Sequence, residues 1–233
     1  MPRYKLEWAL VANFIFVLAI VQQVIAAQPS TPPPAQSEAK SEAKVEGFRS
    51  ARFGMTEAQI LKAIQTDFQI AKDAVVRETN QIEKTTSLSI TVPDLIPGSG
   101  SARVIYIFGY KSKKLTQVTL LWGKPANLNP DASALITAAT LLRNYFAEQG
   151  FPKDKTVING RLDDGTLVVF RGIDEKGGMV LLLLIIPQDD GDAKASKTEE
   201  KAAPVPVKEP SLQLSYVENI NSSDIFKIEK GHF

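Results

Sequence analysis

The sequence predicts an α+β protein in which two helices pack on antiparallel sheet. Two observations predict this class. Segments 57–68 and 130–150 carry apolar residues at helical spacing; start signals precede both, and Gly150 and Pro152 mark the end of the second. Each is followed by short apolar or alternating segments separated by turn residues, at 87–92, 103–110, 115–122, 165–171 and 179–186. The order helix, strands, helix, strands fits either a tandem duplication of a helix-plus-sheet unit or a single α+β sheet.

The first helix begins with a complete set of start signals. Thr56 is a suitable N-cap and Gln59, three residues later, completes a capping box. Met55 before the cap can pack on Ile60 as a hydrophobic staple. The apolar residues after the cap fall on one helical face, which predicts a helix buried on one side.

The next three segments predict an antiparallel meander. Residues 87–92 alternate polar and apolar side chains, which is typical of a strand with one wet face. Turn residues at 97–100 and 111–114 separate them from strands at 103–110 and 115–122. In the middle strand, Tyr106 and Phe108 share one face and Ile105 and Ile107 the other, so at least one face belongs to the core.

A second helix is predicted from Pro130 to Gly150. Asn129 is the expected cap, with Pro130 in the first helical position and Asp131 next to the positive end of the helix dipole. The strands at 165–171 and 179–186 flank a loop, 174–178, that contains two glycines and predicts a hairpin. Segment 179–186 is apolar at every position, which suits a buried strand.

Composition excludes several classes of function. The 233 residues include no cysteine, so disulfides, thiolate zinc sites and cysteine nucleophiles are impossible. The net charge of +1 does not suit a nucleic-acid partner, and His232 is the one histidine. We therefore expect no cofactor and no metal site. The acidic clusters at 163–165 and 189–192 lack calcium-loop spacing and are interpreted as a turn and a linker.

The N-terminus has the order of charges and apolar residues found in secretory signals. Arg3 and Lys5 precede an apolar run, and small residues stand at Ala26 and Ala27. Residues 1–27 are therefore predicted to be a cleaved signal peptide, and the protein to be periplasmic or secreted. The alternative is an uncleaved anchor, since the apolar stretch approaches the length that spans a bilayer. Membrane contact is expected only through this segment, if it is uncleaved.

Composition divides the rest of the chain into four parts. Residues 28–45 and 188–210 are rich in Pro, Ala, Ser, Glu and Lys and predict two disordered linkers. Between them, residues 46–187 form the predicted folded domain. Hydrophobic residues return in 211–233, which is too short to fold alone and is predicted to dock.

Docking of this last segment has two alternatives. It can add a strand to its own domain, which the tether favours by raising the local concentration, or to the sheet edge of a partner. In the second case its apolar side chains would be the partner-binding residues, together with a tryptophan at a predicted strand end. These candidates are Leu212, Leu214, Tyr216, Phe226, Phe233 and Trp122.

A short resemblance gives a further expectation. The segment Phe53-Gly54-Met55-Thr56-Glu57-Ala58-Gln59-Ile60-Leu61 resembles the opening of the repeats in secreted β-lactamase inhibitor proteins. It also resembles the opening of the small lipoprotein subunit of the outer-membrane β-barrel assembly machinery. The resemblance implies a helical segment packed on antiparallel sheet and a role in binding other proteins. The chain lacks the cysteines that lipidate or cross-link those families.

Together these features predict a non-enzymatic protein-binding or envelope-assembly module with an envelope protein as its partner. One alternative is a hydrolase that works without histidine through Asp163, Asp164 and Asp174, provided that one pocket brings them together. Another is a module that binds cell wall or a small ligand in a groove lined by Trp122, Tyr110 and Tyr145.

Overall fold

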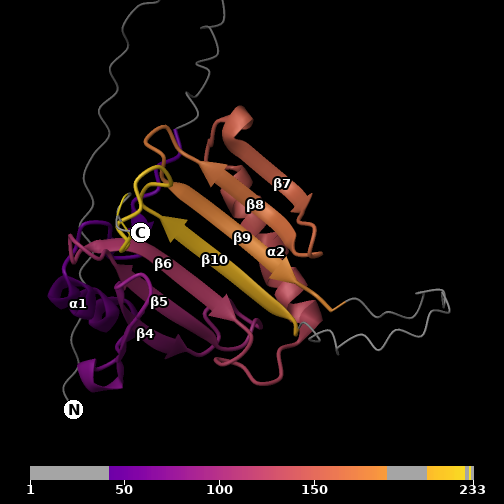
Figure 1. Ribbon diagram of the computed structural model, residues 1–233. Coiled ribbons are helices and arrows are strands. Elements are labelled where there is room, and N and C mark those ends of the chain that lie inside the picture. The colour runs from indigo at the N-terminus through magenta and orange to yellow at the C-terminus, as the bar shows by residue number, and fades with distance from the viewer. Residues whose placement is uncertain (1–41, 188–208, 229–230, 232–233) are drawn as a thin grey trace, which may run out of the picture. The chain divides into compact units, whose positions relative to one another are not determined.

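The computed structural model describes residues 42–187, 209–228 and 231. Two α-helices, α1 (Glu57–Phe68) and α2 (Ala132–Ala147), pack on an eight-stranded antiparallel sheet, and a two-stranded hairpin lies beside it (Figure 1). The predicted α+β class is therefore confirmed. The predicted linkers 28–45 and 188–210 and the signal segment 1–27 fall almost wholly outside the described residues.

The strands are short and follow one another in two meanders. The hairpin consists of β1 (Gly47–Phe48) and β2 (Ala51–Arg52). The first meander contains β3 (Val76–Thr79), β4 (Thr86–Val92), β5 (Ala102–Phe108) and β6 (Leu115–Trp122). The second contains β7 (Thr156–Arg161), β8 (Leu167–Ile173), β9 (Met179–Ile185) and β10 (Ser211–Val217).

The order of the strands reveals a repeated unit. Across the sheet the order is β3-β4-β5-β6-β10-β9-β8-β7, with every neighbouring pair antiparallel. Each half consists of a helix, a turn of 3₁₀ helix (Lys72–Ala74 or Lys153–Lys155) and a four-stranded meander. The last strands of the two halves pair at the centre. The chain thus combines the two predicted alternatives, because two equivalent units share one continuous sheet.

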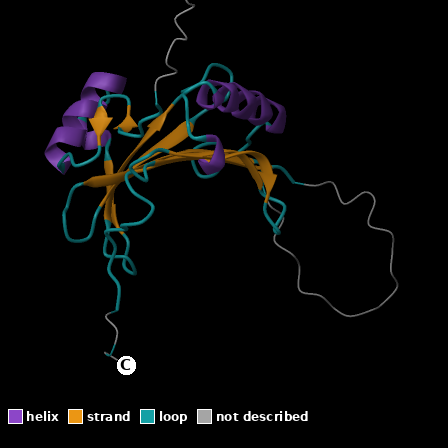
Figure 2. Cartoon of the chain, turned by 90° about the horizontal axis from the view of Figure 1, so that it is seen from above, coloured by secondary structure: helices purple, strands orange, loops and turns teal. Residues whose placement is uncertain are grey.

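Both helices cover the same face of the sheet (Figure 2). Ile60 and Ile64 from α1 and Leu135 and Phe146 from α2 are buried against it. The strand residues that face the helices are buried as well, including Tyr106 and Phe108 as the sequence predicts. No described helix covers the opposite face, onto which Figure 1 looks.

The small hairpin fills the space between the helices with an aromatic ring. Phe48 of β1 lies 6.5 Å from Phe68 of α1 and 5.7 Å from Tyr216 of β10, between ring centroids. Tyr216 in turn lies 6.1 Å from Phe146 of α2, which stacks on Phe170 at 5.6 Å. A row of rings therefore joins the two halves above the central strand pair, where aromatic contacts add to the burial of apolar surface.

The helix caps agree with the sequence in one case only. The capping box of Thr56 and Gln59 is present. For α2 the prediction of Asn129 as cap is wrong, since the helix begins two residues later with Asp131 as its cap. The Asp131 carboxylate accepts hydrogen bonds from the amides of Ser133 at 2.8 Å and Ala134 at 3.4 Å. A carboxylate at this end also interacts favourably with the helix dipole, so it competes well with an amide cap.

The C-terminal segment enters the sheet as its fifth strand. β10 pairs with β9 over its whole length and with β6 from Leu212 to Val217 (Figure 1). Of the two docking alternatives, the structure has the one within the chain. The domain also begins earlier than residue 46, because Val45 is part of the core and the Ala43 amide donates to the Gly150 carbonyl at 3.4 Å.

Candidate functional site

The predicted partner-binding residues do not form one surface. Leu212, Leu214 and Trp122 are at most 1% exposed and face the helices. The indole Nε1 of Trp122 donates to the Ser99 hydroxyl at 2.9 Å. In the folded chain these side chains offer nothing to a partner.

Of the other three candidates, Tyr216 stands in the aromatic row, and burial raises the pKa of its phenol. Phe226 is 41% exposed and packs edge-to-face on Tyr110, with 5.6 Å between the ring centroids. Phe233 lies outside the described residues. The tail residues therefore contribute mainly to the fold, apart from the exposed side of Phe226.

After β10 the chain crosses the tips of three hairpins. The Ile220 amide donates to the Gly177 carbonyl at 3.0 Å, the Tyr110 amide donates to the Asp224 carbonyl at 2.8 Å, and the Phe226 amide donates to the Glu83 carbonyl at 2.8 Å. We call residues 218–226 the strap. It ties the β8–β9, β5–β6 and β3–β4 turns together at one end of the sheet.

Asp224 fixes the strap through its side chain. Its carboxylate accepts hydrogen bonds from the amides of Lys111 at 2.8 Å and Ser112 at 2.9 Å. Desolvation alone would raise the pKa of Asp224, but the hydrogen bonds from Ser112 and Lys111 and the charge of Lys111 outweigh it and hold the pKa below its usual range. The Asp224 carboxylate thus has a structural role in this turn, supported by Lys111 and Ser112.

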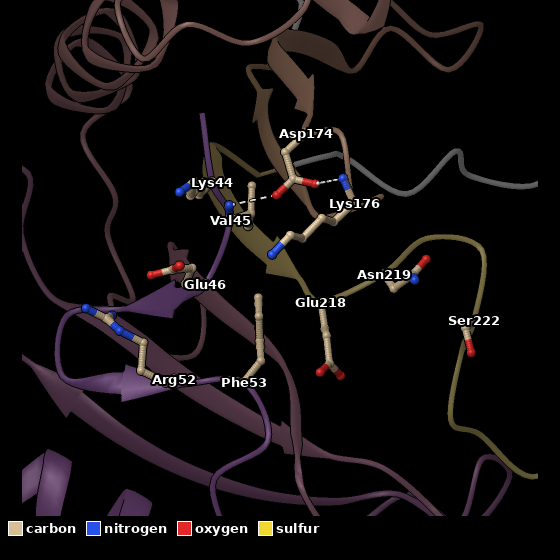
Figure 3. A pocket seen from close by; sticks show the side chains of 10 residues that line it. All are labelled: Lys44, Val45, Glu46, Arg52, Phe53, Asp174, Lys176, Glu218, Asn219 and Ser222. Carbon is tan, nitrogen blue, oxygen red and sulfur yellow. Dashed lines mark hydrogen bonds between the residues drawn. The ribbon is translucent and has the colours of Figure 1, made fainter. Parts of the chain in front are cut away.

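A hollow of about 740 Å³ opens beside the strap, between the N-terminal segment and the β8–β9 turn (Figure 3). Its charged side chains are of both signs. The residues that line it are Lys44, Val45, Glu46, Arg52, Phe53, Asp174, Lys176, Glu218, Asn219 and Ser222.

Asp174 is the buried carboxylate of this hollow, and its oxygens are occupied. They accept hydrogen bonds from the amides of Val45 at 2.9 Å, Lys176 at 2.8 Å and Gly178 at 2.8 Å (Figure 3). A carboxylate held in this way stabilises the turn and the N-terminal segment.

Glu218, on the other side of the hollow, gives a test of its electrostatics. Desolvation and, after it, the charge of Asp224 raise its pKa. At a pH above its folded pKa, Glu218 is charged, and this charge destabilises the folded state. At a pH below its unfolded pKa, Glu218 is protonated in both states and the cost is absent. We expect Glu218→Gln to raise the urea midpoint of unfolding at pH 8 and to leave it unchanged near pH 3. A gain of equal size at both pH values would contradict this origin.

The structure does not assemble the hydrolase alternative. Asp163 and Asp164 lie in the β7–β8 turn and Asp174 in the β8–β9 turn, at opposite ends of β8. Asp164 accepts hydrogen bonds from the amide and hydroxyl of Thr166, both at 3.0 Å. The three carboxylates therefore share no pocket, and the described residues include no histidine.

The aromatic groove is not assembled either. Trp122 is in the core, Tyr110 lies at a hairpin tip, and Tyr145 is exposed on α2. Within the described ranges, no three His, Cys, Asp or Glu side chains are grouped in a way that could hold a metal ion. No described helix is long and apolar enough to span a bilayer.

The uncovered sheet face is the remaining candidate, and the strand register identifies its residues. Phe170, Leu182, Leu214 and Leu120 are directly opposite one another and are buried beneath the helices. Each residue next to these points to the other face. One row across the uncovered face therefore reads Val157, Arg171, Leu181, Ser215, Thr119, Ile105 and Ser89.

Polar side chains occupy the centre of this face and form hydrogen bonds with one another. The Gln117 side-chain amide donates to the Thr119 hydroxyl at 2.9 Å, and that hydroxyl lies 3.3 Å from the Ser215 hydroxyl. The Gln213 side-chain amide donates to Ser215 at 3.2 Å. This ladder separates the two halves of the face.

The second half of the face carries a row of apolar side chains on β9. Met179, Leu181, Leu183 and Ile185 of β9 all point away from the helices and are partly exposed. We call these four residues the β9 patch. The prediction that 179–186 is a buried strand therefore describes one face only, where Val180, Leu182 and Leu184 are covered. The sequence did contain a signal for the β9 patch. A strand with one face in water should alternate polar and apolar residues, and this run does not.

Comparison with known proteins found no matching family model, and no significant match among curated proteins or solved structures. The fold and the uncovered face are thus the basis for a functional proposal.

Proposed function

We propose that the protein is a non-enzymatic binding module that recognises another protein through the uncovered face of β7–β10. The β9 patch is the observation that carries this proposal. In an antiparallel sheet with one solvated face, the residues on that face are normally polar. Four aligned apolar side chains on a face that no described helix covers therefore indicate a binding surface. The resemblance of residues 53–61 to families that bind other proteins supports the same class of function.

The composition of this face resembles that of a protein interface. The β9 patch forms an apolar centre, and Val168 of β8 extends it, opposite Leu183. The hydrogen-bonded ladder around Ser215 forms a polar boundary on one side. An apolar centre within a polar rim is the usual arrangement where one protein covers another.

The sheet edges are less suited to binding an added strand. β3 is four residues long and its charged side chains form ion pairs, Arg77 with Glu57 and Glu78 with Arg103. β7 is interrupted at Asn159, whose φ of 57° lies in the left-handed region. Short, charged or bulged edges discourage strand addition, so the face is the better interface.

We propose further that the protein is exported and that its partner is a protein of the cell envelope. The charged, apolar and small-residue order of residues 1–27 supports this. N-terminal sequencing of the protein recovered from its host should find a chain that begins at Ala27 or Gln28. Recovery from the cytoplasm of a chain that begins at Met1 would contradict export.

Crosslinking in the host cell tests the binding surface. A photoreactive amino acid at Ile185 should give one discrete adduct with another protein, and the same group at exposed Gln65 on α1 should not. The double change Leu181→Thr and Leu183→Thr should reduce the Ile185 adduct about tenfold or more, because interface leucines contribute through burial.

The matched control changes two apolar residues of the other half of the same face. Ile105→Thr with Leu121→Thr removes similar side chains from partly exposed positions, and the Ile185 adduct should persist. Adducts of equal strength at Ile185 and Gln65, or none at either, would overturn the proposed interface.

A further inference from the structure

The uncovered face carries two arginines whose surroundings differ. Arg103 of β5 is paired with a carboxylate: its Nε and Nη2 donate to the Ser89 hydroxyl at 3.2 and 2.9 Å, and Nη2 also donates to Glu78 at 2.9 Å. It therefore has its counter-charge within the first half of the sheet.

Arg171 of β8 has no such partners. It lies directly opposite Leu181 of the β9 patch on one side and Val157 of β7 on the other. Among the described residues no hydrogen bond or ion pair involves its guanidinium, whose Nε is buried without an acceptor. A permanent positive charge thus stands unpaired among apolar side chains.

This arrangement limits what can cover the patch. An apolar partner surface would remove the Arg171 guanidinium from water with no acceptor, which is strongly unfavourable for a charge. A carboxylate on the partner would remove the penalty, because it can accept two parallel hydrogen bonds from a guanidinium. Binding therefore requires apolar contacts and one negative charge in the same place.

We propose that the partner inserts an Asp or Glu side chain, flanked by apolar side chains, over Arg171 of the uncovered face. This inference rests on the proposed function and names the chemistry of its partner. The carboxylate pairs with the guanidinium, while the flanking side chains cover Leu181 and Leu183 of the β9 patch. Charge complementarity then selects the partner, since the apolar contacts alone are not specific.

A protein segment suits this surface better than a lipid membrane. The described residues of this half of the face offer a single cation, at Arg171, whereas anionic membranes are bound by clusters of Lys and Arg. The patch also lies on regular strands, where side chains alternate with a spacing that an extended or helical protein segment can match.

Selection from a phage-displayed library of random dodecapeptides tests the inference with the full chain as target. Only peptides that fail to bind the double variant Leu181→Thr, Leu183→Thr are kept, because these peptides depend on the β9 patch. We expect these peptides to share an Asp or Glu flanked by apolar residues. Arg171→Met, which keeps the length of the side chain but not its charge, should weaken them at least tenfold. If the Arg171→Met variant does not show a native circular dichroism spectrum, the Arg171→Gln variant is used in its place.

Two further variants test whether the charge of Arg171 selects the peptides. A second selection against Arg171→Glu should yield peptides with Lys or Arg at the same place. Arg103→Met removes the satisfied arginine of the same face and should leave the affinity of the acidic peptides within about twofold, because that charge is already paired.

The remaining outcomes separate the inference from the proposed function. Patch-dependent peptides that lack an acidic residue, or that bind Arg171→Met equally well, overturn the inference and leave protein binding intact. Patch-dependent binding of phosphatidylglycerol vesicles in place of peptides assigns the face to a membrane and overturns both. The Ile185 crosslink then distinguishes the cases, since only a protein-binding face gives a protein adduct.

Discussion

Truncation of the chain after Pro210 should abolish the native fold. The deletion removes β10, which lies between β6 and β9 at the centre of the sheet. Without it the sheet separates into two halves, each with a new unpaired edge. The buried side chains of Leu212 and Leu214 are lost as well. We expect weak near-ultraviolet circular dichroism and no cooperative unfolding transition in urea.

The size of the effect follows from ordinary magnitudes. Removing a single buried leucine side chain costs about 2–5 kcal/mol, and a domain has about 5–15 kcal/mol of stability in total. The loss of two such leucines and both ladders of β10 therefore exceeds what the remaining fold can supply. A truncated chain that unfolds cooperatively, with a native-like spectrum, would show that β10 is an accessory strand.

A second truncation is the matched control. Ending the chain after Ile228 keeps β10 and the strap, including the bond between the Phe226 amide and the Glu83 carbonyl. This chain should remain folded. Added as a separate peptide, residues 209–233 should restore structure to the chain that ends at Pro210, because they supply the missing strand.

The strand at the centre of the sheet shows what sequence reasoning could find. The alternation at 211–217 identified a strand, and the tether favoured docking within the chain. The partner-binding interpretation of Leu212 and Leu214 took the same apolar residues as surface anchors. Alternation locates two faces of a strand, but only the neighbouring strands decide whether it lies at an edge or in the middle.

Edge strands were the elements that the sequence did not reveal. β3 reads Val-Arg-Glu-Thr and all four side chains are exposed, so no apolar pattern marks it. In β7 the residue Asn159 is unpaired and has a left-handed backbone conformation, which interrupts the alternation. The pattern methods respond to burial, and an edge strand that buries little on either face leaves almost no signal.

The uncovered face left a signal in the sequence, but the expected burial was wrong for one side of β9. The apolar run at 179–186 predicted burial on both sides, because most such strands are covered by helices on both faces. Both described α-helices lie on one side of the sheet, so neither covers the other face of β9. Arg171 could not be recognised as unpaired, since its neighbours come from β7 and β9 through the register.

Asp174→Ala should cause the largest loss of stability of any single substitution in the β8–β9 turn. The carboxylate is 4% exposed and accepts three backbone hydrogen bonds, from Val45, Lys176 and Gly178. Alanine leaves these amides without their acceptor, and each buried unsatisfied group costs about 1–3 kcal/mol. We expect the free energy of unfolding, measured by urea denaturation, to fall by about 3–5 kcal/mol.

Two further variants separate the roles of the carboxylate oxygens. In Asp174→Asn, the amide oxygen can replace Oδ1, which accepts from Lys176 and Gly178, but its NH₂ group then faces the Val45 amide. This variant should lose about 1–3 kcal/mol and free the segment before β1 for proteolysis. Asp163→Ala, at an exposed carboxylate of the β7–β8 turn, should change stability by less than about 0.5 kcal/mol. If the asparagine and alanine variants of Asp174 were equally stable, the hydrogen bond from the Val45 amide would account for the whole effect, and Oδ1 would contribute no net stability.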